Sequence, residues 1–277
     1  MRKIDAHHHL WNYKEKEFPW ISSDMEILQK NYLPEDLLPI LEETEWEGTV
    51  VVQARQTLEE TEWLLSLAEK YDFMKGVVGW VDLCSNEVES QLRYFSGNPY
   101  LKGVRHIVHD EPDPSFMNRS DFKHGLSLLN KYNLTYDLLL FPEHLKLAER
   151  IAAHFPEQRF VLDHIGKPNI SQQILSPWKE DLFALSRHPN VYCKLSGLVT
   201  EANVSTWKAH DFYPYLDVVF EAFDTDRLMI GSDWPVCRLA GEHKEVIDVV
   251  VDYALRTCPR ELDKIMYENS RKFYQVM

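Results

Sequence analysis

The sequence predicts a (β/α)8 TIM-type barrel, and three observations support this fold class. Short β-rich segments alternate with helical patterns along the chain, giving eight units of about 25 to 40 residues each. The length of 277 residues is close to the roughly 250 residues typical of this barrel. No Gly-x-Gly-x-x-Gly turn follows the first strand, which removes the best support for an open dinucleotide-binding sheet. No linker or repeat divides the chain, so we expect residues 1–277 to form one domain.

The first part of the chain contains two strands and the segments that follow them. Residues 1–10, MRKIDAHHHL, form the first predicted strand. The aromatic residues of 11–20 either cover the mouth of the barrel or pack in its core. Pro34 opens a helix, because proline is well tolerated in a first helical turn. The β-branched run 48–54 is typical of a strand buried on both faces.

The helix after the second strand has a defined start in the sequence. Thr57, with Glu60 three residues later, predicts a capping box in which each side chain bonds the backbone N–H of the other. Apolar residues at helical spacing follow this pair, as expected for a helix that packs on a sheet.

The same alternation of strand and helix continues to the end of the chain. The remaining strands are predicted at 74–83, 101–110, 135–141, 159–166, 190–197 and 227–235, with terminal helices at 246–255 and 261–274.

Composition limits the class of partner. Hydrophobic residues make up 44% and charged residues 27%, as in ordinary soluble globular proteins. A formal net charge of -14 disfavours nucleic acid and anionic membrane surfaces, since both are polyanions, and leaves small molecules as the expected partners. No apolar run has the length of a signal peptide or a bilayer span, so we expect a cytoplasmic protein. The four cysteines have no metal-clip spacing and are expected to be reduced.

The histidines of the first strand are candidates for a metal or acid/base site. Side chains alternate along a strand, so His7 and His9 share one face with Asp5 below them, while His8 points the other way into the packing. Two imidazoles beside a carboxylate form half of a metal or acid/base site. A surface histidine run or the remnant of an expression tag is the alternative, which the position of the run inside an apolar segment disfavours.

Polar residues recur at the predicted strand ends. The active site of such a barrel lies at the C-terminal ends of its strands, and burying an unpartnered ionisable group costs several kcal/mol, so we expect these residues to converge on one pocket. Asp82 and Asp137 also fit the role of hydrogen-bonded scaffold residues. The full set is His7 and His9, Asp82, Arg105 and His106, Asp137, Asp163 and His164, and Ser232 and Asp233.

Four motifs together resemble one family. They are DAHHHLW at 5–11, GVRH at 103–106, LDHIGKP at 162–168 and GSDWP at 231–235. Each motif is weak alone, but the combination resembles the amidohydrolase superfamily and, within it, the sugar-lactonase branch of L-fuconolactonase-like and L-rhamnonolactonase-like enzymes. The resemblance extends from Ile4 to Tyr274.

The resemblance implies a metal-capable site at the barrel mouth. Carried over by position, the implied metal ligands are His7, His9, His164 and Asp233. Binuclear members of the superfamily use a bridging lysine or glutamate on the fourth strand and a histidine on the fifth, where this chain has Arg105 and the pair Tyr136 and Asp137. We therefore expect one divalent ion, Zn²⁺ or Mn²⁺, or none, because a related pyrone-dicarboxylate lactonase family works without a metal.

The reaction that the resemblance implies is the opening of a sugar-acid lactone by water. Attack on the ester carbonyl creates an oxyanion, and stabilising this charge is usually the largest catalytic contribution. A metal at His7 and His9, or these imidazoles with His164 and Arg105, would supply the positive field. Asp233 is the candidate general base that takes a proton from water and returns it to the leaving ring oxygen. His164 is either a ligand or an acid/base group.

The substrate is predicted from the hydrogen-bonding and aromatic groups near the strand ends. A neutral sugar lactone needs several polar groups and an aromatic wall, for which the candidates are Trp80, Asp82, Arg105, His106 and Trp234. A dicarboxylate would need more cations than the strand ends supply, so a sugar lactone is favoured.

Two other functions stay open at this point. The first is a metal-dependent non-oxidative decarboxylase of an aromatic carboxylate, since the same branch resembles enzymes with a similar His/Asp set. The second is a catalytically silent barrel that only binds a ligand, which the presence of all the candidate ligands disfavours. The sequence also leaves open whether the chain forms a homo-oligomer.

Overall fold

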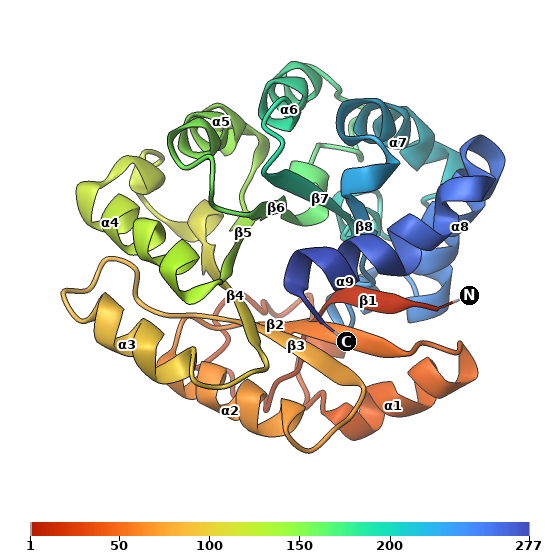
Figure 1. Cartoon of the computed structure of the whole chain (residues 1–277). Helices are drawn as coiled ribbons and strands as arrows, with labels where there is room; N and C mark the ends of the chain where they lie inside the picture. The colour runs from red at the N-terminus through yellow and green to blue at the C-terminus, as the bar shows by residue number, and fades with distance from the viewer. Residues whose placement is uncertain (1, 277) are drawn as a thin grey trace.

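The computed structural model describes residues 2–276 and is an eight-stranded parallel barrel surrounded by helices (Figure 1). The strands pair in chain order from β1 to β8, and a bridge between His8 and Trp234 joins the first strand to the segment after the last. The strands are β1 Ile4–His8, β2 Gly48–Val52, β3 Met74–Gly79, β4 Leu101–Ile107, β5 Thr135–Leu139, β6 Phe160–Leu162, β7 Val191–Leu195 and β8 Leu228–Ile230. The predicted (β/α)8 barrel is confirmed.

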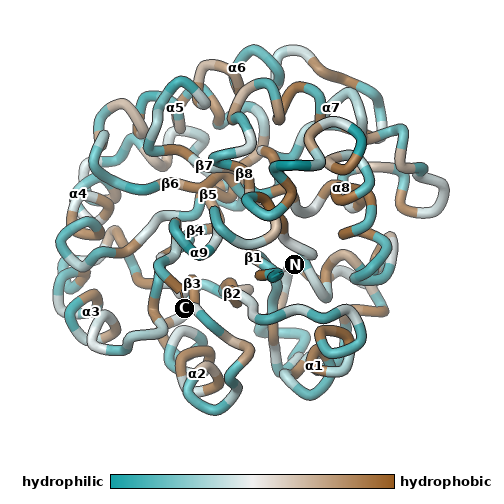
Figure 2. The backbone as a smooth tube through the Cα atoms, turned by 45° about the vertical axis from the view of Figure 1, so that its right-hand side comes forward, coloured by the Kyte–Doolittle hydropathy of each residue, from teal (hydrophilic) through white to brown (hydrophobic). Residues whose placement is uncertain are grey.

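The outer ring consists of helices that alternate with the strands. The helix α9 Asn269–Tyr274 follows α8 and lies outside this ring. The helices of the ring are α1 Pro34–Glu43, α2 Leu58–Ala68, α3 Val88–Phe95, α4 Ser120–Leu129, α5 Leu145–His154, α6 Trp178–Ser186, α7 Ala209–Phe223 and α8 His243–Thr257. These helices carry both apolar and polar residues, seen as brown and teal segments in Figure 2. Their buried residues belong to one large core between the helices and the barrel.

A second, smaller core fills the interior of the barrel. Ile4, Val50, Val78 and Met229 pack there with residues of the C-terminal segment. The helix α9 lies against β1 and β8, and its Tyr274 is buried. The C-terminal segment therefore closes the end of the barrel where the strands begin, and the opposite end is left for a site.

Several strands are shorter at their C-terminal ends than the sequence predicts. β4 ends at Ile107 instead of 110, β6 at Leu162 instead of 166, and β8 at Ile230 instead of 235. Residues 108–110 and 163–166 form short 3-10 helices, whereas residues 231–233 are irregular and Trp234 keeps a bridge to His8. The segments after β6 and β8 carry His164 and Asp233 of the site.

The position of Asp5 differs from the prediction. The pairing of β1 with β2 shifts register between Asp5 and His8, so the simple alternation of side chains is interrupted. Asp5 faces α8, where its Oδ2 lies 3.2 Å from Nε2 of His243. The prediction that Asp5 lies below His7 on the same face is therefore wrong.

The predicted capping box of α2 is only half formed. Thr57 Oγ1 accepts a hydrogen bond from the Glu60 N–H at 3.2 Å, as predicted. The Glu60 carboxylate instead turns inward and accepts a hydrogen bond from the N–H of Ala54 at 3.0 Å. Glu60 is almost completely buried, and this burial raises its pKa to about 7.

Glu60 should make the stability of the fold depend on pH. In the unfolded chain it titrates near its ordinary pKa of 4.5, so between this pH and about 7 the folded state binds the extra proton. The free energy of unfolding therefore falls as the pH rises through this window. Between about pH 4.5 and pH 8, we expect the free energy of unfolding of the native chain to fall by about 3 kcal/mol more than that of Glu60→Gln. Urea unfolding of both proteins across this range measures it, and parallel pH profiles would contradict the prediction.

All four cysteines, Cys84, Cys193, Cys237 and Cys258, are free thiols. Within residues 2–276, no helix combines the length and the apolar character that crossing a membrane requires.

Candidate active site

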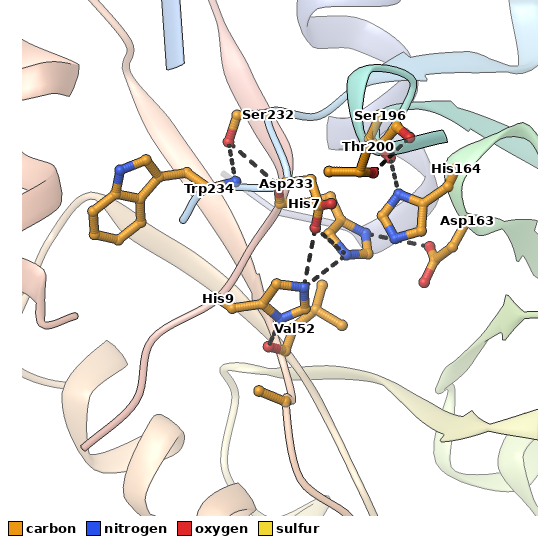
Figure 3. Close-up of polar contacts among 12 residues, drawn as sticks. His7, His9, Val52, Asp163, His164, Ser196, Thr200, Ser232, Asp233 and Trp234 are labelled. Atoms are coloured by element: carbon orange, nitrogen blue, oxygen red, sulfur yellow. Dashed lines mark hydrogen bonds and ion pairs between the residues drawn. The ribbon is translucent and has the colours of Figure 1, made fainter. Parts of the chain in front are cut away.

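A cavity of about 490 Å³ opens at the C-terminal end of the barrel. His9 after β1, Arg105 on β4, His164 after β6 and Asp233 after β8 all line it. His7 lies beneath them and is fully buried. The predicted convergence of polar strand ends on one pocket is confirmed for these residues. Figure 3 shows the three imidazoles turned toward one another around Asp233.

The orientation of His9 is fixed by a backbone carbonyl. Its Nδ1 lies 2.7 Å from the oxygen of Val52, and a carbonyl oxygen can only accept, so Nδ1 carries the proton. Nε2 of the neutral ring is then unprotonated, and it lies 3.3 Å from Oδ1 of Asp233 and 3.2 Å from Nε2 of His7. His9 thus presents a lone pair to the floor of the pocket.

His164 is held in an unusual backbone segment. Four consecutive residues from His164 to Lys167 have left-handed φ angles of 53°, 50°, 76° and 49°. Such runs are disfavoured for side-chain-bearing residues and cluster at functional sites. The imidazole Nδ1 lies 2.9 Å from Oγ of Ser196, which leaves Nε2 for the pocket.

The imidazole of His164 occupies space that is free because the residue at position 197, just after β7, is a glycine. Gly197 has a φ of 63°, and a Cβ at this position would lie 2.4 Å from Nδ1 of His164. Glycine is therefore required here both by the backbone conformation and by the space that the imidazole occupies.

Asp233 is positioned by its backbone contacts with β1. Its φ is 58°, and its N–H donates to the carbonyl oxygen of His7 at 2.8 Å. Burial alone raises its pKa, but interactions with His164 and His9 outweigh burial and hold the pKa of this carboxyl below its ordinary value. Asp233 is therefore an ionised acceptor at neutral pH.

A buried carboxylate behind the site joins the first strand to the segment after the last. Asp5 accepts hydrogen bonds from the N–H of His7 at 3.1 Å, from the N–H of Ser232 at 2.9 Å and from the Ser232 hydroxyl at 2.6 Å. The predicted strand-end residue Ser232 thus fixes the backbone just before Asp233 and does not line the pocket.

Arg105 lies at the pocket floor but is already paired. Its Nη1 donates to Oδ2 of Asp163 at 3.0 Å, and its Nη2 donates to the carbonyl oxygen of Gln53. Only 3% of Arg105 is exposed. The guanidinium therefore neutralises Asp163 and contributes positive field from a fixed position.

The sequence reasoning missed Lys194 on β7, whose ammonium group lies in the barrel interior. Its Nζ is 2.6 Å from Oδ2 of Asp137, 3.0 Å from Oδ1 of Asp163 and 3.1 Å from Nδ1 of His7. The side chain is fully buried. A lysine inside the apolar run NVYCKLSG was the signal that could have identified it, because a buried lysine requires partners. Asp137 has the scaffold role that the sequence left open.

Four residues predicted to bind substrate do not line the pocket: Trp80, Asp82, His106 and Trp234. His106 is adjacent to Arg105 on β4, so strand alternation turns it toward the helices, where its Nε2 lies 2.6 Å from Oε1 of Glu111. Trp80 donates from Nε1 to Nδ1 of His106 at 3.3 Å. Their positions do not support contact with substrate.

The other two of these residues have structural contacts. Asp82 accepts a hydrogen bond from the N–H of Cys84 at 3.0 Å and thereby closes the turn after β3. Trp234 is buried and packs edge-on against Tyr32, with ring centroids 5.2 Å apart. Their positions also do not support contact with substrate.

The walls of the pocket come mostly from segments after the strands, including the aromatic segment 11–20, for which the sequence left the barrel mouth and the core open. Trp20, from the aromatic segment after β1, lines the pocket, whereas Trp11 and Phe18 of the same segment are core residues. Phe141 after β5 provides a second aromatic wall. The remaining lining residues are Met25, Ala54, Ile107, His109, Asp110, Leu139, Lys167, Thr200, Glu201, Val236 and Leu239.

The donor atoms at the pocket floor fit one divalent ion. One ligand atom each from His7, His164 and Asp233 lie within 4.8 Å of one another. Nε2 of His9 lies 3.2 Å from Nε2 of His7 and 3.3 Å from Oδ1 of Asp233, but His9 is not one of the three donors that all lie within 4.8 Å of one another. Ligands of a tetrahedral ion with bonds of about 2.1 Å lie about 3.4 Å apart. The two contacts of His9 match this spacing, whereas the limit of 4.8 Å on the other three donors is wider. Among residues 2–276, no second group of this kind is found.

The protonation states also suit a metal. Burial lowers the pKa of His7 well below its ordinary value and that of His164 to about 4. These imidazoles are therefore neutral at neutral pH, which is the form that binds metal ions.

Comparison with known sequences identifies relatives over nearly the whole chain. The amidohydrolase family model matches residues 4–276. An L-fucono-1,5-lactonase of Burkholderia multivorans is 37% identical over 265 residues, which cover 91% of this chain and 88% of that protein. An L-fucono-1,5-lactonase of Burkholderia ambifaria is 35% identical over 239 residues, covering 86% and 82%.

A solved structure agrees with these relatives. The crystal structure of an amidohydrolase from Burkholderia multivorans with bound zinc superposes with a TM-score of 0.96 at 34% identity, covering 100% of both chains. The family model and the superposition both include the residues of the four motifs. The chain belongs to the amidohydrolase family.

Proposed function

We propose that this protein hydrolyses a sugar-acid lactone of the L-fucono-1,5-lactone type to the corresponding aldonic acid. The observation that carries the proposal is the Asp233 carboxylate at the floor of the cavity, within 3.3 Å of Nε2 of His9. The two relatives named L-fucono-1,5-lactonase support the choice of substrate.

The pocket has the size and the surfaces that such a substrate needs. A cavity of about 490 Å³ suits a single sugar ring. Trp20 and Phe141 offer aromatic surfaces to the apolar face of the ring and to the methyl group of a 6-deoxy sugar. Lys167, which is paired with Glu201, and Asp110 supply hydrogen-bonding groups for the ring hydroxyls.

The chemistry requires one proton to be moved twice. Water adds to the lactone carbonyl carbon and gives a proton to the carboxylate of Asp233. The bond between this carbon and the ring oxygen then breaks, and Asp233 returns the proton to the ring oxygen, which becomes a hydroxyl. The oxyanion that forms in between lies in the field of Arg105, whose guanidinium is held by Asp163.

His7, His9, His164 and Asp233 would hold the divalent ion, for which zinc and manganese are the candidates. When bound, the ion supplies a Lewis acid for the carbonyl oxygen and lowers the pKa of water. The zinc in the similar Burkholderia multivorans structure supports this assignment. Val52 and Ser196 orient two of the ligating imidazoles through their other ring nitrogen, as is usual around metal sites.

A panel of aldonolactones tests the function directly. We expect acid release, followed with a pH indicator, to be fastest with L-fucono-1,5-lactone and slower with L-rhamnono- and D-series lactones. Spontaneous hydrolysis is subtracted using heat-inactivated protein. No acid release from any aldonolactone would refute the proposal, and release of carbon dioxide from 2,6-dihydroxybenzoate would favour the decarboxylase.

Metal removal tests the cofactor separately. We expect about one equivalent of zinc or manganese per chain in the purified protein, in line with the one donor cluster found in residues 2–276. Chelation should abolish most of the activity, and added Zn²⁺ or Mn²⁺ should restore it. Full turnover by protein shown to be metal-free would refute the metal assignment and leave lactone hydrolysis standing.

A further inference from the structure

The contacts of His7 permit two arrangements of its single ring proton. Nδ1 lies 3.1 Å from Nζ of Lys194 and 3.3 Å from Oδ1 of Asp163. Nε2 lies 3.2 Å from Nε2 of His9 and 3.4 Å from Nη1 of Arg105. Each ring nitrogen therefore faces one cation that can only donate a hydrogen bond and at least one group that can accept, since Nε2 also lies 3.7 Å from Oδ1 of Asp233.

The first arrangement uses the two shorter contacts. Lys194 donates to Nδ1 of His7, whose proton then resides on Nε2 and is donated to Nε2 of His9. His9 in turn donates from Nδ1 to the oxygen of Val52 at 2.7 Å. Every member of this chain is satisfied without a metal ion.

The second arrangement is the one that a metal requires. A metal ligand must offer a lone pair, so Nε2 of His7 must lose its proton. The neutral ring then carries the proton on Nδ1, which donates to Oδ1 of Asp163 at 3.3 Å. Lys194 retains its partners Asp137 at 2.6 Å and Asp163 at 3.0 Å. One proton leaves Nε2 and one is gained at Nδ1, so the charge of the ring does not change.

We propose that Lys194 is a positioning residue that acts through His7: its hydrogen bond to Nδ1 stabilises the metal-free tautomer and thereby weakens the binding of a divalent ion. The inference rests on the metal site proposed above. Asp163 has the opposite effect, because it accepts the proton that the metal-bound tautomer places on Nδ1. The balance between Lys194 and Asp163 sets how readily the pocket exchanges its metal.

A pair of variants isolates the contribution of the lysine. Lys194→Met alone leaves two buried carboxylates with one cation fewer, so it is combined with Asp137→Asn, which keeps the local charge balanced. The matched control is Asp137→Asn, which retains the bond from Lys194 to His7. Competition with a zinc-chelating dye should show that the double variant binds Zn²⁺ about tenfold more tightly than the control, a typical effect of groups that orient metal ligands.

The tautomer itself can be measured without any variant. In protein labelled with ¹⁵N-histidine, long-range ¹H–¹⁵N spectra should place the proton of His7 on Nε2 in the metal-free chain and on Nδ1 after addition of zinc. The control for the assignment is His9, whose proton should remain on Nδ1 in both states because Val52 accepts it.

Three outcomes would overturn the inference. They are equal zinc affinity of the double variant and its control, a His7 tautomer that does not change with zinc, and absence of zinc binding by the native chain. Lactone hydrolysis is assayed on the same samples. If hydrolysis persists in any of these cases, the control by Lys194 is refuted while the proposed reaction stands.

Discussion

Replacing Asp233 with asparagine should lower kcat/KM for lactone hydrolysis by about 10³-fold and leave the fold intact. The amide has nearly the same shape but cannot take a proton from water. The backbone contacts that hold residue 233, including the N–H that donates to His7 O at 2.8 Å, do not involve the carboxylate. Activity, thermal unfolding and zinc content are measured on the same preparation. If activity is lost while the zinc content is full, Asp233 acts as the general base and the loss is not due to a missing metal ligand.

The matched control for this variant is Asp110→Asn. Asp110 lines the same cavity, but neither its carboxylate nor its backbone contacts the histidine cluster around Asp233. The same chemical change there should reduce kcat/KM by less than about tenfold, the effect of one lost hydrogen bond to a substrate hydroxyl. Near-native turnover by Asp233→Asn would refute the general-base role.

The order of the elements could be predicted because it is encoded locally. A buried parallel strand needs a continuous apolar run, and GTVVVQA and TYDLLLF show such runs without any knowledge of their partners. The ends of strands could not be predicted equally well. Whether His164 continues β6 or turns into a left-handed segment is decided by contacts with Ser196 and Gly197, which are distant in sequence.

The centre of the site was predictable, whereas its surroundings were not. His7 lies at the end of β1, and His9, His164 and Asp233 follow strands whose C-terminal ends must meet in a barrel, so topology alone brings them together. Their roles as ligands and base stay predictions until the variants are measured. Alternation of side chains along β4 is sufficient to place His106 on the side opposite to Arg105.

The residues that support and surround the centre depend on long-range contacts. Lys194 is buried only because Asp137 on β5 and Asp163 just after β6 surround its ammonium group. Asp5 leaves the face of His7 because β1 shifts register against β2. Loops such as the one that carries Trp20 reach the pocket through tertiary packing, for which the sequence contains no periodic signal.

Gly197→Ala should lower kcat/KM by at least about 10²-fold and reduce the free energy of unfolding by about 1 to 3 kcal/mol. The stability loss follows from a side chain at a φ of 63°. The activity loss follows because the new Cβ would lie 2.4 Å from Nδ1 and 2.6 Å from Cγ of His164, so the imidazole must leave its position beside Ser196. Urea unfolding and steady-state kinetics measure the two effects independently.

Gly97→Ala is the matched control for this change. The nearest atom to a Cβ at Gly97 is the carbonyl oxygen of Tyr94 at 3.4 Å, an ordinary contact, and no residue of the site is nearby. Gly97→Ala should therefore leave kcat/KM unchanged and alter stability by less than about 1 kcal/mol. If Gly197→Ala loses stability but keeps native turnover, the position of the His164 imidazole is not critical for the reaction. Its role as ligand or acid/base group is then wrong, because a displacement of about 1 Å in either role costs about 10²-fold.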